Sequence, residues 1–210
     1  MPTIEEAKNW YPLNDPVHGF NHILRVYRVA EQLAVAEGAD LEVVRAAALL
    51  HDAEGPGAGD NRLKHQHASA NFAGEILAAE GWSEGMIAAV QHCIRSHRYR
   101  DPSEQPDTIE AKVLYDADKL DAIGAVGAVR AIAYAVLAEQ DLYAEPSDLF
   151  LNTGEKEPCE PHTPYHEYLF KLRKLKDQMY TKSGRAIAER RHKYLEGFFM
   201  QLIAEIKGDK

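Results

Sequence analysis

A buried helix is indicated most clearly by the stretch Asp40-Leu-Glu-Val-Val-Arg-Ala-Ala-Ala-Leu-Leu-His51-Asp52. Its apolar side chains cover nearly every side of a helix, which is typical of a helix inside a protein core. Asp40 is a residue type that caps the first turn of a helix. The Gly- and Pro-rich segment 54–60 that follows breaks regular structure. We therefore expect a central helix over 41–53, with the polar pair His51-Asp52 where it opens into a loop.

Helical patterns continue on both sides of this stretch. Segments rich in Ala, Leu, Glu and Arg, with few internal glycines, predict helices at 21–37, 65–80, 83–97, 108–121 and 123–139. After an irregular, Pro-containing stretch at 145–161, two amphipathic helices are predicted at 165–181 and 184–206. No strand pattern is found. We expect an all-α, single-domain bundle over residues 1–210, with its core at 20–140 and the helices within 163–206 packing on it.

The composition is that of a soluble globular protein and limits the partners. Of the 210 residues, 45% are hydrophobic and 27% are charged. No apolar run is long enough to cross a bilayer, the N-terminus does not read as a signal peptide, and the two cysteines form no CxxC pair, so we expect a cytoplasmic location. The net charge of −9 argues against general nucleic-acid binding.

One stretch departs from this acidic balance. Residues 171–193 carry nine Lys or Arg and two Asp or Glu. We expect these cations to form a solvent-facing helix surface, because basic runs on helices commonly face solvent. The alternative is a cationic rim that attracts anionic substrates.

The pair His51-Asp52 indicates a metal site when it is taken with two other positions. A carboxylate beside an imidazole is costly at the end of an apolar helix unless something pairs with both. A metal ion would do so, and the alternative is a hydrogen-bonded core histidine or a helix-end polar pair. His22 begins another predicted helix. Asp118 is one of several acids in an otherwise apolar helix, where acids seldom lie without a cation.

The acids around Asp118 do not share one face of their helix. Asp118 and Asp121 are three residues apart and lie on the same face, whereas Asp116 lies roughly opposite Asp118. At most one of these two faces is therefore expected to address the site.

Several longer sequence motifs, spread over nearly the whole chain, are similar to those of a known family. They are His22-Ile-Leu-Arg-Val, Ile94-Arg-Ser-His97, Thr108-Ile-Glu-Ala-Lys112, the stretch from Asp116 to Arg130, Lys171-Leu-Arg-Lys-Leu-Lys, Thr181-Lys-Ser-Gly-Arg185 and Ala188-Glu-Arg-Arg-His192. With the order H…HD…D of His22, His51-Asp52 and Asp118, the chain resembles the HD-domain metal-dependent phosphohydrolases. It is similar above all to a bacterial subgroup of small HD proteins, some of which hydrolyse nucleotides.

This resemblance implies that His22, His51, Asp52 and Asp118 hold one divalent ion. Two imidazoles and two carboxylates suit a six-coordinate Mn, Mg, Fe, Co or Ni ion better than a closed tetrahedral zinc site. Two positions would remain for water and a substrate oxygen. The implied reaction is hydrolysis of a phosphoester or phosphoanhydride bond in a nucleotide. The ion activates the attacking water, and Asp52 is expected to be catalytic as well as a ligand.

The expected partner is this small phosphorylated substrate. We expect no membrane binding, and the sequence is compatible with a homo-oligomer.

Five further residues are candidates beside the metal ligands. Glu54 follows the HD pair, and in some nucleotide-hydrolysing relatives an acid one residue further along orients the attacking water; the alternative is a solvated loop glutamate. Lys64 and Lys119 would neutralise phosphate charge, the alternative being surface cations. His18 and His97 are assigned to substrate binding, and the alternative is a supporting contact to a metal ligand.

A second metal ion is the alternative to one. Dinuclear HD proteins, including di-iron oxygenases, add histidines between the HD pair and the last aspartate, an interval that holds His65, His67, His92 and His97. His65 and His67 point to nearly opposite sides of a helix, and His92 and His97 lie about 140° apart, so at most one of each pair is expected to reach the core. A third alternative is a non-catalytic binding module with a structural metal.

Overall fold

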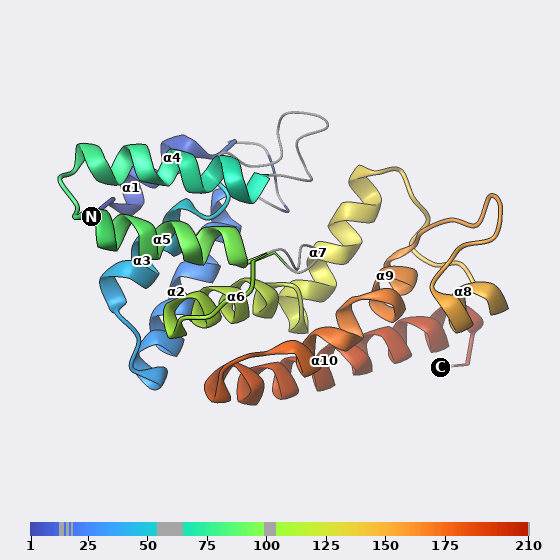
Figure 1. The fold of residues 1–210 in the computed structure, drawn as a ribbon. Coiled ribbons are helices and arrows are strands. Elements are labelled where there is room, and N and C mark those ends of the chain that lie inside the picture. Colours follow the sequence, from blue (N-terminus) through green and yellow to red (C-terminus); the bar gives the residue numbers. More distant parts are fainter. Residues whose placement is uncertain (13–14, 16, 18, 54–64, 99–103, 210) are drawn as a thin grey trace. The chain divides into compact units, whose positions relative to one another are not determined.

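The computed structural model describes residues 1–12, 15, 17, 19–53, 65–98 and 104–209 (Figure 1). The described residues form no strand, which confirms the all-α prediction. In chain order the helices are α1 (Ile4–Ala7), the 3₁₀ helix η1 (Lys8–Trp10), α2 (Phe20–Glu37), α3 (Leu41–Leu50), α4 (His65–Ala79), α5 (Glu84–Ser96), α6 (Ile109–Asp121), α7 (Gly124–Leu137), α8 (Asp148–Thr153), α9 (Pro164–Phe170), the 3₁₀ helix η3 (Leu172–Gln178) and α10 (Lys182–Lys207).

The chain divides into two compact units, which are described separately. Unit 1 contains Met1–Lys119 and Met179–Gly184, and unit 2 contains Leu120–Gln178 and Arg185–Lys210. The expectation of a single domain over residues 1–210 stays a prediction.

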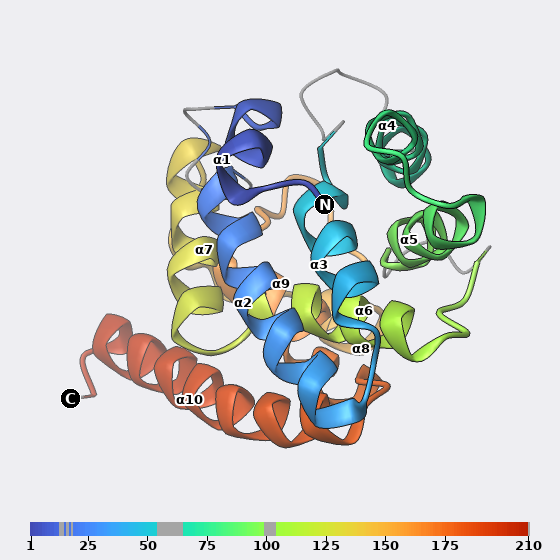
Figure 2. The ribbon, with the colours of Figure 1, turned by 90° about the vertical axis from the view of Figure 1, so that its left-hand side faces the viewer.

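Unit 1 is built around α3, as the apolar sequence of this helix predicts. All apolar residues from Val43 to Leu50 are buried. α3 contacts α2 and also the pair formed by α4 and α5. Figure 2 shows α2 beside α3, and α4 beside α5. Asp40 caps the first turn of α3 by accepting hydrogen bonds from the N–H groups of Glu42 and Val43, so the predicted start of the helix is confirmed.

The segment Met179–Gly184 is held in unit 1 by Asp116 of α6. This fully buried carboxylate accepts hydrogen bonds from Tyr180 N (2.8 Å), Thr181 N (2.8 Å) and Thr181 Oγ1 (2.6 Å). Thr181 Oγ1 in turn accepts a hydrogen bond from Gly184 N at 2.9 Å, in the first turn of α10. Asp116 is therefore a structural acid, with partners that differ from those of Asp118 as the helix phase predicts.

A methyl group at Gly184 is expected to disrupt this anchor. Its Cβ would lie 2.3 Å from Asp116 Oδ2 and 2.6 Å from Thr181 Oγ1. We expect Gly184→Ala to lower the free energy of unfolding by about 2 kcal/mol, because overpacking a tight site costs about 1–3 kcal/mol. Gly197→Ala, also in α10, is the matched control. A Cβ added at Gly197 would have no described atom within 4 Å. Because alanine favours the helix over glycine, this substitution should raise the free energy of unfolding by about 0.5–1 kcal/mol. Urea denaturation measures both changes, and shifts of the same sign would contradict the account.

In unit 2, Glu160 organises the stretch that the sequence predicts to be irregular. Its carboxylate accepts hydrogen bonds from Ser147 N (2.8 Å), Ser147 Oγ (2.7 Å) and Glu157 N (2.7 Å), and lies 3.1 Å from His166 Nε2. Ser147 also caps α8, its hydroxyl accepting from Phe150 N at 3.0 Å. The six-residue helix α8 therefore lies within the stretch 145–161. It depends on tertiary contacts rather than on a long periodic pattern.

The helix predicted at 165–181 is wrong as a single element. α9 ends at Phe170, and the chain continues as the 3₁₀ helix η3. Leu172 and Leu175 of η3 are both buried. Residues three apart lie above one another in a 3₁₀ helix, so this tighter helix buries both leucines on one side. The amphipathic pattern was therefore correct and the type of helix was not.

The basic stretch 171–193 lies largely at the surface, as predicted. Its exposed cations are Arg173, Lys174, Lys182, Arg185, Arg190 and Lys193.

Among the described residues, no single helix has both the length and the apolar character needed to cross a membrane, and only the bent pair of α6 with α7 passes that test, by length and composition.

Candidate metal centre

The pair His51-Asp52 follows α3 in a turn that is tied back onto the end of the helix. Three consecutive backbone carbonyls of α3 have different partners there: Ala48 O contacts His51 Nδ1 (2.9 Å), Leu49 O accepts from the Tyr11 hydroxyl (2.7 Å) and Leu50 O accepts from Ala53 N (3.2 Å). The last of these spans three residues rather than four, as in a 3₁₀ turn. The helix predicted over 41–53 therefore tightens and ends at Leu50.

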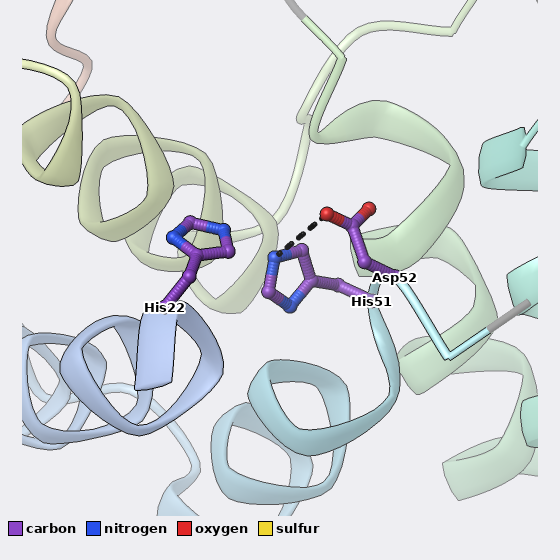
Figure 3. A group of neighbouring side chains, drawn as sticks. All are labelled: His22, His51 and Asp52. Carbon is purple, nitrogen blue, oxygen red and sulfur yellow. Dashed lines mark ion pairs between the residues drawn. The ribbon is translucent and has the colours of Figure 1, made fainter. Parts of the chain in front are cut away.

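His51 presents its second ring nitrogen to the site. The side chain is fully buried, and donation from Nδ1 to Ala48 O leaves Nε2 with its lone pair. Nε2 has no hydrogen-bond partner among the described residues and lies 3.7 Å from Asp52 Oδ2 (Figure 3). Burial lowers the pKa of His51 to about 4, although the charge of Asp52 opposes this shift. At neutral pH the ring is therefore neutral, which is the form that binds metal ions.

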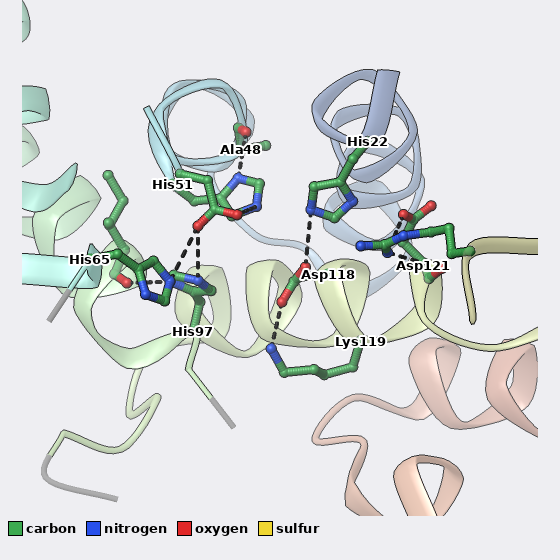
Figure 4. Close-up of polar contacts among 11 residues, drawn as sticks. His22, Ala48, His51, His65, His97, Asp118, Lys119 and Asp121 are labelled. Atoms are coloured by element: carbon green, nitrogen blue, oxygen red, sulfur yellow. Dashed lines mark hydrogen bonds and ion pairs between the residues drawn. The ribbon is translucent and has the colours of Figure 1, made fainter. Parts of the chain in front are cut away.

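His22 and Asp118 approach the HD pair from two other helices. His22 lies in the first turn of α2, and its ring centroid is 5.5 Å from that of His51. His22 Nε2 is 3.4 Å from Asp118 Oδ1 of α6 (Figure 4). Asp118 Oδ2 pairs with Lys119. Of the four residues predicted as metal ligands, His22, His51 and Asp52 thus form one group with metal-ligand spacing, and Asp118 of α6 lies beside His22.

Two more histidines contact the other side of Asp52. Asp52 Oδ1 lies 3.4 Å from His65 Nε2 and 3.5 Å from His97 Nε2 (Figure 4). His97 follows α5 as His51 follows α3, and its Nδ1 contacts Ile94 O, three residues back, at 2.5 Å. The same backbone contact thus orients Nε2 of both histidines.

The two carboxyl groups are ionised, although only 16% of each side chain is exposed. Burial raises the pKa of Asp52, but the neighbouring imidazoles of His51, His65 and His97 stabilise its carboxylate form and outweigh this effect, so the pKa lies well below its usual range. Burial likewise raises the pKa of Asp118, and the charge of Lys119 with the hydrogen bond from His22 more than offsets this, again lowering the pKa well below its usual range. The site therefore holds anionic oxygens beside neutral imidazole nitrogens.

Only one histidine of each pair, His65/His67 and His92/His97, lies in the site, as the positions of these residues on their helices predict. His67 is exposed, and His92 lies 2.7 Å from Glu104 instead of in the site. His97 and His65 are the members of each pair that reach Asp52. His65 was absent from the predicted site residues. The phase of α4 indicated that either His65 or His67 would face inward, but the sequence did not decide which.

The other predicted residues have different outcomes. Lys119 pairs with Asp118, and its Nζ lies 5.1 Å from the ring centroid of Tyr115. The predictions for His18, Glu54 and Lys64 fall outside the described residues.

The nitrogen and oxygen atoms of His22, His51 and Asp52 are spaced to bind one divalent ion. The ligand atoms of His22, His51 and Asp52 lie within 4.8 Å of one another. Nitrogen and oxygen ligands bind such ions at about 2.0–2.2 Å, so ligands on opposite sides of an ion are about 4 Å apart. A second group with the same spacing consists of Asp52, His65 and His97. Asp52 belongs to both groups.

Comparisons with known proteins agree with this arrangement. Residues 19–123 match the model of the HD domain family. The chain is 32% identical over 195 residues to the uncharacterized protein YpgQ of Bacillus subtilis, covering 91% of this chain and 85% of that protein. The crystal structure of YpgQ in complex with ADP has a TM-score of 0.74 at 30% identity, covering 99% of this chain and 100% of that chain.

A further solved structure carries the name of the superfamily. An HD-superfamily hydrolase from Bacillus thuringiensis has a TM-score of 0.70 at 28% identity, covering 97% of this chain and 96% of that chain.

This chain is an all-α protein whose histidines and aspartates follow the order H…HD…D and form a group able to hold a divalent metal ion. The chain belongs to the HD-domain family of metal-dependent phosphohydrolases. The family inferred from the sequence motifs is thereby confirmed.

Proposed function

We propose that the chain is a phosphohydrolase in which His22, His51, Asp52 and Asp118 hold one divalent ion. The observation that carries this proposal is His51 Nε2, a buried nitrogen with no hydrogen-bond partner among the described residues, which lies 3.7 Å from the ionised carboxylate of Asp52. Leaving a buried polar atom unpaired costs about 1–3 kcal/mol. An ion bound by Nε2 removes that cost and also offsets the charges of the carboxylates.

Each side chain has a defined part in this proposal. When bound, a divalent ion supplies Lewis-acid polarisation of a phosphoryl oxygen and lowers the pKa of a coordinated water. His51 and His97 are held in one ring orientation by backbone carbonyls, so neither has to reorganise when substrate binds. Lys119 places an ammonium group beside Asp118, where it would offset phosphate charge.

We further propose that the substrate is a nucleotide, cleaved at a phosphoester or phosphoanhydride bond. Its support is the ADP complex of YpgQ, together with the motifs shared with nucleotide-hydrolysing relatives. Asp52, Glu54, Lys64, His18 and His97 remain the proposed catalytic and substrate-binding residues. A cytoplasmic location and a possible homo-oligomer complete the proposal and are untested predictions.

A substrate screen tests the proposal. The chain, loaded in turn with Mn²⁺, Mg²⁺, Co²⁺ and Ni²⁺, is incubated with nucleoside mono-, di- and triphosphates, and the products are identified. We expect turnover of at least one nucleotide by the native chain and by Asp141→Ala, which alters an exposed acid. Asp118→Ala should be inactive. Absence of product with every metal and nucleotide would contradict the proposal.

A dinuclear centre, as in the di-iron oxygenases, is the second candidate because Asp52 also belongs to the group with His65 and His97. We expect one ion per chain, measured by elemental analysis after dialysis, and the same number in a His65→Ala, His97→Ala double variant. His67→Ala, which removes an exposed imidazole from α4, is the control. Two irons per native chain with substrate-dependent oxygen uptake would replace the phosphohydrolase with an oxygenase.

A further inference from the structure

Tyr11 comes from outside the helices that carry the candidate ligands, yet it reaches the end of α3. It follows η1 and is buried in a cluster with Ala7, Ile23 and Leu49. Its ring centroid lies 5.9 Å from that of Phe20 at the start of α2. Apolar packing alone would be served equally well by phenylalanine, so the hydroxyl group needs its own explanation.

The Tyr11 hydroxyl occupies a position that the helix leaves open. In an uninterrupted α-helix, Leu49 O would accept from the N–H group four residues later, which is that of Ala53. Ala53 N instead donates to Leu50 O at 3.2 Å. The Tyr11 hydroxyl donates to Leu49 O at 2.7 Å and satisfies this buried carbonyl.

The phenol of Tyr11 stays protonated and can donate this hydrogen bond. Burial, followed by the nearby charge of Asp52, raises the pKa of Tyr11 well above its usual range. The hydroxyl is therefore bonded to the last turn of α3, directly before the turn that bears His51 and Asp52.

We propose that Tyr11 is a positioning residue that fixes the turn bearing His51 and Asp52 for metal binding. Leu49 O, which it holds, adjoins Ala48 O, which orients the His51 ring. A shift of this turn would move both side chains together, because they are adjacent in the chain. Tyr11 acts only through the backbone, and the inference rests on the proposed binding of a divalent ion by these residues.

Tyr11→Phe tests this role, because it removes the hydroxyl and keeps the ring. Titration of the metal-free full chain with Mn²⁺, followed by calorimetry, should show about tenfold weaker binding, in the range found when groups that orient metal ligands are removed. Turnover should recover at high Mn²⁺ concentration, with kcat changed much less than the half-saturating metal concentration. In the metal-free protein, the amides of Asp52 and Ala53 should exchange hydrogen faster.

Tyr168→Phe is the matched control. Tyr168 is a buried tyrosine of unit 2 whose ring stacks on Phe199, with centroids 4.6 Å apart. It should leave Mn²⁺ affinity unchanged. Native Mn²⁺ affinity in Tyr11→Phe, even with a lowered melting temperature, would show a merely structural role and overturn the inference alone. If the native chain itself binds no Mn²⁺, the proposed function fails and the inference falls with it.

Discussion

Replacing Asp52 with Asn is expected to abolish both divalent-metal binding and phosphohydrolase turnover. Asp52 is the residue shared by the two candidate ligand groups, and its oxygens lie 3.4 to 3.7 Å from His51, His65 and His97. The amide keeps the shape of the side chain but removes the charge that attracts a cation. Metal ions contribute several kcal/mol to hydrolysis, so we expect a fall in kcat/KM on the order of 10³-fold or more.

The measurement combines metal content after dialysis with turnover at saturating metal. Asp141→Asn, a charge-neutralising change at an exposed position, is the matched control and should keep native values. Circular dichroism establishes that Asp52→Asn is folded. Retention of metal and full turnover in Asp52→Asn would remove the basis of the proposed function.

The metal-free chain is expected to lose stability as the pH falls from about 6.5 to about 4. The pKa of His51 is about 4 in the folded chain, against an ordinary value of 6.5. Across this window the unfolded chain binds a proton that the folded chain does not, so acid favours unfolding. The difference corresponds to about 3 kcal/mol at about 1.4 kcal/mol per pKa unit. Asp52 and Asp118, whose pKa values are lowered, add a further loss at still lower pH.

Urea denaturation of the metal-free chain between pH 7.5 and pH 4.5 measures this loss. His51→Gln removes the buried imidazole and should flatten the dependence on pH. His67→Gln, which removes an exposed imidazole from α4, is the control for the substitution itself. If the free energy of unfolding depends on pH equally in the native chain and in His51→Gln, His51 is not held neutral by burial.

The helices that bury a long apolar stripe were predictable because their pattern repeats many times. α3 is the clearest case: its apolar run predicts a buried central helix, and its capping residue Asp40 marks the start. α8 was missed because six residues carry too little pattern, and Ser147 and Glu160 hold it through contacts made only in the folded chain. The break at Phe170 was missed because leucines three residues apart suit both kinds of helix.

The candidate site was predictable where chemistry and helix phase act together. Buried acids and histidines are costly, so His22, His51-Asp52 and Asp118 stood out from the apolar segments around them. The inward turn of His65 depends on the rotation of α4 about its axis, which the sequence leaves open between His65 and His67. The contact of Tyr11 with Leu49 joins residues 38 positions apart. No local pattern indicates such a contact.

The central claim is that one divalent ion lies between α2, the end of α3 and α6. An anomalous difference map from a crystal of the full chain grown with Mn²⁺ tests this most directly. The account predicts one peak, within bonding distance of His22 Nε2, His51 Nε2 and carboxylate oxygens of Asp52 and Asp118. Manganese bound elsewhere, or no peak at these four residues, would contradict it.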